Sequence, residues 1–223
     1  MKQIDAILFD WDGTLVDSAQ MAFYAMKNAL GNLGILLERG AYERVFSPNW
    51  YRMYEAFGLE RDKWRAADEL WLKHYGKGSP CLVPAAYSTV WQLSHRGYDL
   101  GIVSSGSSIR VKHELKKFGI DEAFRVVLCN EDTQNKKPHP EALEMAMVRI
   151  DKKRHACSYV GDCPEDVEMG KRARVLTAGV RSKYPSSRNL RSAGPDLYLE
   201  SIEELLDYFR GPGSDFKGQK SKV

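Results

Sequence analysis

The chain has 223 residues, of which 43% are hydrophobic and 28% are charged, a composition typical of folded globular proteins rather than disordered ones. At roughly 100 to 200 residues per domain, this length allows one or two domains with a hydrophobic core. The formal net charge is +3, too small to favour a nucleic-acid or an anionic-membrane partner through long-range electrostatics.

Cysteine spacing and the N-terminal residues favour a cytoplasmic protein. The four cysteines form no CxxC pair and have no accompanying histidine spacing, which argues against a zinc knuckle or a redox motif and for reduced thiols. The first acid, Asp5, leaves no apolar run before it that could act as a signal peptide or membrane span.

The first predicted element is a buried strand at residues 4–9, which ends in Asp10-Trp11-Asp12-Gly13-Thr14. Residues 18–84 then show helical rather than strand periodicity and hold eleven of the aromatic residues. Large side chains of this kind suit a small helical bundle with its own core. We therefore expect an all-α helical domain at 17–84, inserted into a core domain formed by 1–16 and 85–210.

Strands and helices alternate after this insert. Short apolar runs predict further strands at residues 98–103, 124–129, 158–160 and 175–180, with helical patterns between them. A capping box, Ser201-x-x-Glu204, opens a last helical pattern, and a Gly-rich basic tail at 211–223 is expected to be disordered. Such alternation predicts an α/β fold with a doubly wound parallel sheet.

Polar residues follow several predicted strands and should meet at one edge of the sheet, because catalytic side chains gather at the carboxyl ends of parallel strands. They are Asp10, Asp12, Ser104, Ser105, Asp162 and Asp166, joined by Lys137 at a loop before a helix. Carboxylates suit a divalent cation, whereas hydroxyls, backbone N–H groups and a lysine suit a phosphate. This set predicts a site for Mg²⁺ and a phosphate group.

The two acids after the first strand fit a nucleophile and a proton donor. Asp10 can attack phosphorus when a magnesium ion offsets its repulsion of the phosphate dianion. Asp12, two residues on, can protonate the leaving oxygen and then take a proton from the attacking water. Ser104, Ser105 and Lys137 are candidate phosphate ligands.

These residues occur in four ordered motifs that resemble those of the haloacid dehalogenase superfamily, most closely its phosphoglycolate-phosphatase-like branch with a helical cap. The motifs are Phe9-Asp10-Trp11-Asp12-Gly13-Thr14-Leu15-Val16-Asp17-Ser18, the hydroxyl after Gly101-Ile102-Val103, Lys137-Pro138-x-Pro140, and Gly161-Asp162-x-x-x-Asp166. The resemblance implies a Rossmann-like core and a cap that closes over a small-molecule phosphomonoester. It also implies Mg²⁺ held by Asp10, Asp12 (through its backbone carbonyl), Asp162 and Asp166.

A loop of the expected cap, Phe46-Ser47-Pro48-Asn49-Trp50, interrupts the helical pattern, and Ser47 and Asn49 are candidate specificity residues. The leading hypothesis is a magnesium-dependent phosphatase that works through an aspartyl-phosphate. A phosphomutase of the same fold remains open, as does, from another class, a receiver-like module switched by phosphorylation of an aspartate. No pattern in the chain indicates an oligomeric state.

Overall fold

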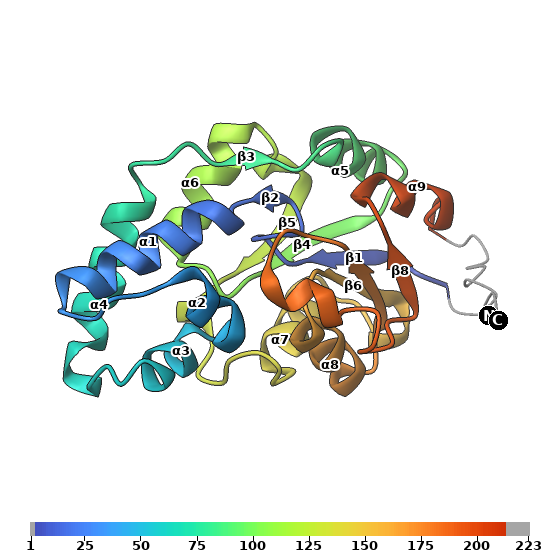
Figure 1. Ribbon diagram of the computed structural model, residues 1–223. Helices are drawn as coiled ribbons and strands as arrows, with labels where there is room; N and C mark the ends of the chain where they lie inside the picture. Colours follow the sequence, from blue (N-terminus) through green and yellow to red (C-terminus); the bar gives the residue numbers. More distant parts are fainter. Residues whose placement is uncertain (1–2, 213–223) are drawn as a thin grey trace.

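The computed structural model describes residues 3–212 and has a six-stranded parallel sheet at its centre (Figure 1). The strand order is β5-β4-β1-β6-β7-β8. The strands are β1 Ala6–Phe9, β4 Asp99–Val103, β5 Phe124–Leu128, β6 Cys157–Gly161, β7 Leu176–Val180 and β8 Leu197–Leu199. This topology confirms the predicted α/β fold with a doubly wound sheet.

Helices cover both faces of the sheet, and successive residues of β1 face different layers. Ile7 and Phe9 belong to the apolar cluster shared with α5, α6 and α9, whereas Ala6 and Leu8 pack in the cluster shared with α7 and α8. Burial on both sides explains why this strand is a continuous apolar run. The covering helices are α5 Ala86–His95, α6 Ser108–Phe118, α7 Glu141–Arg149, α8 Pro164–Ala173 and α9 Leu205–Tyr208.

A helical region lies between β1 and β4, on the left in Figure 1, as predicted. Its helices are α1 Ala19–Asn32, α2 Arg39–Val45, α3 Trp50–Ala56 and α4 Trp64–Tyr75. They surround a separate apolar cluster that includes Phe23, Met26, Leu30 and Tyr54. The domain limits at 17 and 84 stay a prediction, and the expected tail falls almost wholly on residues 213–223, outside the described part of the chain.

A short antiparallel pair joins this helical region to the rest of the chain. It consists of β2 Val16–Asp17 and β3 Cys81–Leu82, with Val16 opposite Leu82 and Asp17 opposite Cys81. Strand β3 is not predictable from periodicity, because two residues are too few to show alternation. The insert therefore leaves and re-enters the core at neighbouring points.

The C-terminal part of the described chain differs from expectation in two ways. Strand β8 was not predicted, and the last helical pattern forms a 3₁₀ turn, Ile202–Glu204, before the four-residue α9. The predicted capping box is confirmed, since the Glu204 carboxylate accepts from the Ser201 backbone N–H at 3.1 Å. The other 3₁₀ turns are Arg61–Lys63, Asp121–Ala123, Asn130–Asp132, Arg154–Ala156 and Pro185–Asn189.

Across residues 3–212, none of the helices combines the length and the apolar character needed to cross a lipid bilayer.

Candidate active site

One cavity of about 300 Å³ opens where the sheet meets the helical region. Its lining includes predicted site residues from three strand ends and from two loops, namely Asp10, Asp12, Ser104, Ser105, Lys137 and Asp162. Asp10 directly follows β1, Ser104 follows β4 and Asp162 follows β6. Since β1 pairs with both β4 and β6, the parallel topology brings these three ends side by side.

Lys137 is buried and forms two ion pairs. Its Nζ atom donates to Asp10 Oδ1 at 2.7 Å and to Asp166 Oδ1 at 2.8 Å. Burial alone would lower the pKa of Lys137, but the two carboxylates outweigh it and raise this pKa well above its usual value. The lysine is therefore a fixed positive charge beside Asp10.

Burial and the neighbouring acids disfavour the ionised forms of Asp10 and Asp162. Burial, opposed by Lys137, raises the pKa of Asp10 to about 7, with Asp166 and Asp12 adding to the rise. Burial and the same neighbour Asp166 raise the pKa of Asp162 well above its usual value. A divalent cation bound by oxygen ligands would relieve this repulsion, so the residues present fit Mg²⁺.

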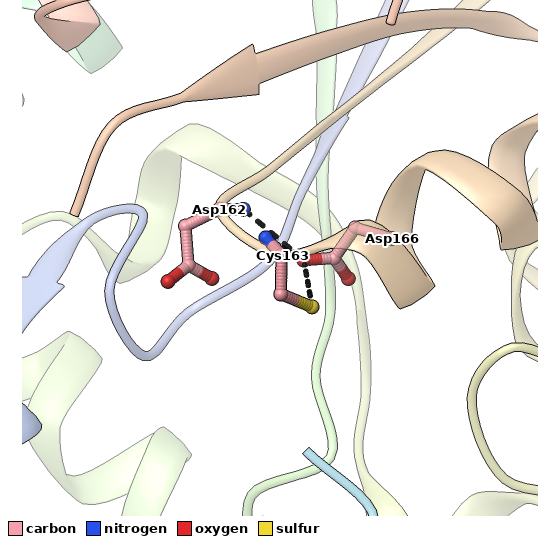
Figure 2. A group of neighbouring side chains, drawn as sticks. All are labelled: Asp162, Cys163 and Asp166. Carbon is pink, nitrogen blue, oxygen red and sulfur yellow. Dashed lines mark hydrogen bonds between the residues drawn. The ribbon is translucent and has the colours of Figure 1, made fainter. Parts of the chain in front are cut away.

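Asp166 differs from these two acids because both of its oxygens are already engaged. Oδ1 accepts from Lys137 and from the Tyr159 hydroxyl at 3.2 Å. Oδ2 accepts from the backbone N–H groups of Asp162 and Cys163 and from the Cys163 thiol, as Figure 2 shows. This arrangement favours a role in positioning the β6–α8 loop and Lys137 over direct binding of the metal.

The neighbouring thiol is a poor partner for such an ion. The sulfur of Cys163 lies with the Asp162 and Asp166 oxygens in a group that could hold a metal. Burial raises the pKa of Cys163 well above its usual value, so the sulfur stays protonated, and magnesium prefers oxygen ligands. Asp10 and Asp162 are thus the better-suited ligands.

Asp12 is held by residues that the sequence did not point to. The Arg110 guanidinium contacts both carboxylate oxygens, at 3.1 Å and 2.5 Å, and Ser18 Oγ donates to Oδ1 at 2.6 Å. Arg110 also pairs with Glu114 at 3.2 Å, and Glu114 accepts from the Trp11 indole at 2.6 Å. Arg110 and Glu114 lie four residues apart on α6, beside the apolar positions of that helix, which is the signal that could have drawn attention to them.

Two glycines permit close packing around these acids. Gly13 has a φ of +84°, and a Cβ atom there would lie 2.3 Å from Asp162 Oδ2. At Gly106 a Cβ atom would lie 2.3 Å from the Arg110 guanidinium. A side chain at either position would displace a charged group of the site.

Two of the three predicted phosphate ligands, Ser104 and Ser105, lie between β4 and the start of α6. Ser104 is buried, and its Oγ accepts from the Gly106 backbone N–H at 2.9 Å, which shapes the turn before the helix. Ser107 caps α6 by accepting from the Arg110 backbone N–H. Ser105 lines the cavity beside them, so hydroxyls and a helix N-terminus face the same space as Asp10.

The helical region closes the cavity from the other side. Of the two predicted specificity residues, Ser47 lines the cavity, whereas Asn49 is not among the lining residues and donates its backbone N–H to Ser47 Oγ at 3.2 Å. The Phe46 ring packs on Tyr184 of the core with centroids 5.0 Å apart. The Tyr184 hydroxyl lies 3.0 Å from Ser18 Oγ, so this contact links the cap loop to the residue that holds Asp12.

Comparisons with known proteins identify the family of the chain. The family model of the haloacid dehalogenase-like hydrolases matches residues 7–180. Proteins named pyrophosphatase PpaX are 30% identical over 211 residues in Halalkalibacterium halodurans and 29% identical over 222 residues in Listeria monocytogenes. These alignments cover 92% and 93% of this chain, and 96% and 97% of the relatives.

A solved structure has the same fold. The crystal structure of a predicted phosphoglycolate phosphatase from Haemophilus somnus matches with a TM-score of 0.81 at 22% identity, over 93% of this chain and 98% of that one. The family model spans the residues that line the cavity from Asp10 to Asp162. The chain therefore belongs to the family of haloacid dehalogenase-like hydrolases.

Proposed function

We propose that this protein is a magnesium-dependent phosphatase that hydrolyses a small phosphomonoester through an aspartyl-phosphate on Asp10. The observation that carries the proposal is the buried contact of Lys137 with Asp10 at 2.7 Å, in one cavity with Asp12, Ser104 and Asp162. An acid, a fixed cation and hydroxyls in one enclosed space suit transfer of a phosphoryl group to a carboxylate.

In the first step an Asp10 oxygen forms a bond to phosphorus while the bond from phosphorus to the alcohol oxygen breaks. Asp12 gives its proton to that oxygen. A water molecule then attacks the same phosphorus and gives a proton to Asp12, while the bond from phosphorus to the Asp10 oxygen breaks. Inorganic phosphate leaves, and the Asp10 carboxylate is restored. Mg²⁺, when bound by Asp10 and Asp162, supplies positive charge that lets two anions approach each other.

Arg110 and Ser18 hold the Asp12 carboxyl in the described state. To act as an acid, Asp12 must release one oxygen from these donors, because the proton on that oxygen has to face the leaving oxygen rather than a guanidinium N–H or a hydroxyl donor. Lys137 and the hydroxyls of Ser104 and Ser105 bind the oxygens of the phosphoryl group.

The names of the relatives favour a second candidate, hydrolysis of pyrophosphate, in which the same residues act and phosphate is the leaving group. A phosphomutase would also use these residues but would return the phosphoryl group to a sugar. A time course of phosphate release distinguishes a mutase from a phosphatase or a pyrophosphatase, because a mutase supplied with its bisphosphate activator releases almost no phosphate.

The test is hydrolysis of p-nitrophenyl phosphate with Mg²⁺ by the variant Asp10→Asn. We expect loss of turnover with an unchanged circular dichroism spectrum, and loss of turnover by the wild type when a chelator removes the metal. The matched control is Asp5→Asn, because Asp5 directly precedes β1 whereas Asp10 directly follows it. Unchanged hydrolysis by Asp10→Asn would refute the nucleophile, and activity that survives chelation would refute the metal requirement.

A further inference from the structure

A carboxylate from the helical region faces the cavity and is not used by the proposed chemistry. Asp68 on α4 lines the cavity and is only partly buried. Its Oδ1 accepts from the Trp50 indole at 2.8 Å and from the Tyr54 hydroxyl at 3.0 Å. Its Oδ2 accepts one longer hydrogen bond, from Tyr51 at 3.2 Å. Because a carboxylate offers about four acceptor positions, Oδ2 can still accept from a ligand.

The three donors hold this carboxyl group in place and stabilise its ionised form. Burial raises the pKa of Asp68, and the hydrogen bonds from Tyr54, Trp50 and Tyr51 oppose that rise. Asp68 is therefore a hydrogen-bond acceptor that is held in a fixed position among aromatic side chains.

The walls around Asp68 are aromatic and apolar. Four aromatic residues of α3 and α4 line the cavity, namely Trp50, Tyr51, Tyr54 and Trp71. The first three donate hydrogen bonds to Asp68, whereas the Trp71 ring lies 5.6 Å from the Arg110 guanidinium. Met26, Met53 and Leu72 line it beside them. Aromatic rings attract cations through the negative charge on their faces, and a carboxylate among such rings adds a direct electrostatic attraction. A positively charged organic group is the ligand that this combination suits.

The charged residues that line the whole cavity also favour a positively charged ligand. Among its described lining residues the acids are Asp10, Asp12, Asp68, Glu131 and Asp162, whereas the cations are Lys137 and Arg110. Lys137 is already paired with Asp10 and Asp166, and Arg110 with Asp12 and Glu114. Mg²⁺ and a phosphate dianion would offset each other, so Asp68, the acid that the helical region contributes to the described lining, would remain without a counter-charge.

This distribution disfavours a second phosphate as the leaving group. The lining residues that α3 and α4 contribute include Asp68 and no lysine or arginine. A pyrophosphate would therefore place negative charge near Asp68, while the cation on this side, Arg110 beside Trp71, is already paired with Asp12 and Glu114. A leaving alcohol that carries a positive charge would instead gain from both Asp68 and the rings.

We propose that the substrate is the phosphate monoester of an amino alcohol, whose ammonium group binds between Asp68 and the aromatic side chains of α3 and α4. This inference rests on the proposed phosphatase function and specifies its substrate class. A cavity of about 300 Å³ has room for a small molecule of this kind, at the lower end of the size of ligand pockets.

The first test compares two substrates of nearly equal shape with the wild-type protein. Choline phosphate carries a quaternary ammonium group, and 3,3-dimethylbutyl phosphate replaces its nitrogen by carbon. We expect kcat/KM for choline phosphate to exceed that of the neutral analogue by about tenfold or more, with ethanolamine phosphate also preferred. Equal values for the charged and neutral esters, or a higher value for pyrophosphate than for either amino-alcohol ester, would overturn the proposal.

The second test assigns this preference to Asp68. In Asp68→Asn the ratio of the two kcat/KM values should fall to about threefold or less, because the rings remain but the charge is lost. Asp68→Glu should restore part of the ratio, which a purely structural role would not predict. Glu69→Gln is the matched control, since Glu69 is exposed and pairs with Arg65 at the surface. An unchanged ratio in a folded Asp68→Asn protein would refute the assignment.

The wild-type comparison keeps the proposal testable if Asp68→Asn fails to fold. Hydrolysis of p-nitrophenyl phosphate shows whether the proposed substrate class or the proposed phosphatase function is wrong. If the protein hydrolyses this aryl ester but shows no preference for the charged alcohol, the substrate class is wrong and the phosphatase function stands. If it hydrolyses none of these esters with Mg²⁺, the proposed function itself is wrong.

Discussion

Two ion pairs with the same sequence spacing, on helices that cover opposite faces of the sheet, should differ greatly in their contribution to stability. Arg110 and Glu114 on α6 are i,i+4 partners whose side chains are 8% and 3% exposed. Glu168 and Arg172 on α8 are also i,i+4 partners, but each is 50% exposed. Their order, acid before base, is the more favourable one for an isolated helix, so intrinsic helix energetics would favour the exposed pair. Burial reverses this ranking.

The perturbation is Arg110→Met, which leaves Glu114 buried without its cation. Removing one partner of a buried ion pair costs about 3–5 kcal/mol. For a chain of this size that corresponds to a melting temperature lower by about 6–20 °C. The control Arg172→Met should cost about 0.5 kcal/mol or less, because solvent screens an exposed pair.

The assay is urea unfolding of the wild type, Arg110→Met, Glu114→Gln and the double variant. Glu114→Gln keeps an oxygen that can accept from the Trp11 indole, so the cycle isolates the charge interaction. We expect the double variant to be more stable than the sum of the two single losses implies. A loss below about 1 kcal/mol for Arg110→Met, or no coupling in the cycle, would refute the reasoning.

The same variant should show a defined pH dependence. Burial raises the pKa of Glu114 from 4.5, and Arg110 opposes that rise, so removing Arg110 raises the pKa further. Between the unfolded and the folded pKa, the folded state then binds more protons than the unfolded state, and stability falls as pH rises. The loss caused by Arg110→Met should therefore grow from about pH 4.5 upwards and shrink on acidification. A loss that grows on acidification would contradict this sign.

Two further predictions concern positions away from the site. Arg174 is exposed and has a φ of +60° at the end of α8, so Arg174→Gly should raise the unfolding free energy by about 0.5–1 kcal/mol. Gly119 has a φ of +64° and open space around it, so Gly119→Ala should lower the unfolding free energy by about 0.5–1 kcal/mol. Changes of the same sign for the two variants in urea unfolding would contradict the argument. A thiol-specific chromogenic disulfide should label Cys81 quickly in the native protein, because it is exposed; rapid labelling of a second thiol would contradict the burial of Cys129, Cys157 and Cys163.

The strand-end residues were predictable because topology alone brings them together. Once β1 is recognised as a buried parallel strand, the residue after it must lie beside the residues that follow its neighbours in the sheet. Asp10, Ser104 and Asp162 meet this condition, and all three line one cavity. The convergence needed no knowledge of side-chain contacts.

Other parts of the site depend on contacts that no local pattern encodes. Arg110 reaches Asp12 across 98 residues of sequence, and its charged side chain at a helix position is typical of exposed surface. Asp68 likewise sits in a stretch with ordinary helical periodicity, and its acceptor role appears only when α3 packs beside α4. Strand β8 was missed because three residues at a sheet edge give too short a pattern.

The central place of β1 has a consequence for how the chain folds during synthesis. Ala6 pairs with Asp99 on one side and with Cys157 on the other, so β1 acquires its second neighbour only after the ribosome has added about 150 further residues. Until then the edge of β1 that pairs with β6 keeps unpaired N–H and C=O groups beside apolar side chains, a state that favours aggregation and recruits chaperones. Nascent chains that stop before residue 157 should therefore remain protease-sensitive in the core, whereas those that extend past β7 should become resistant.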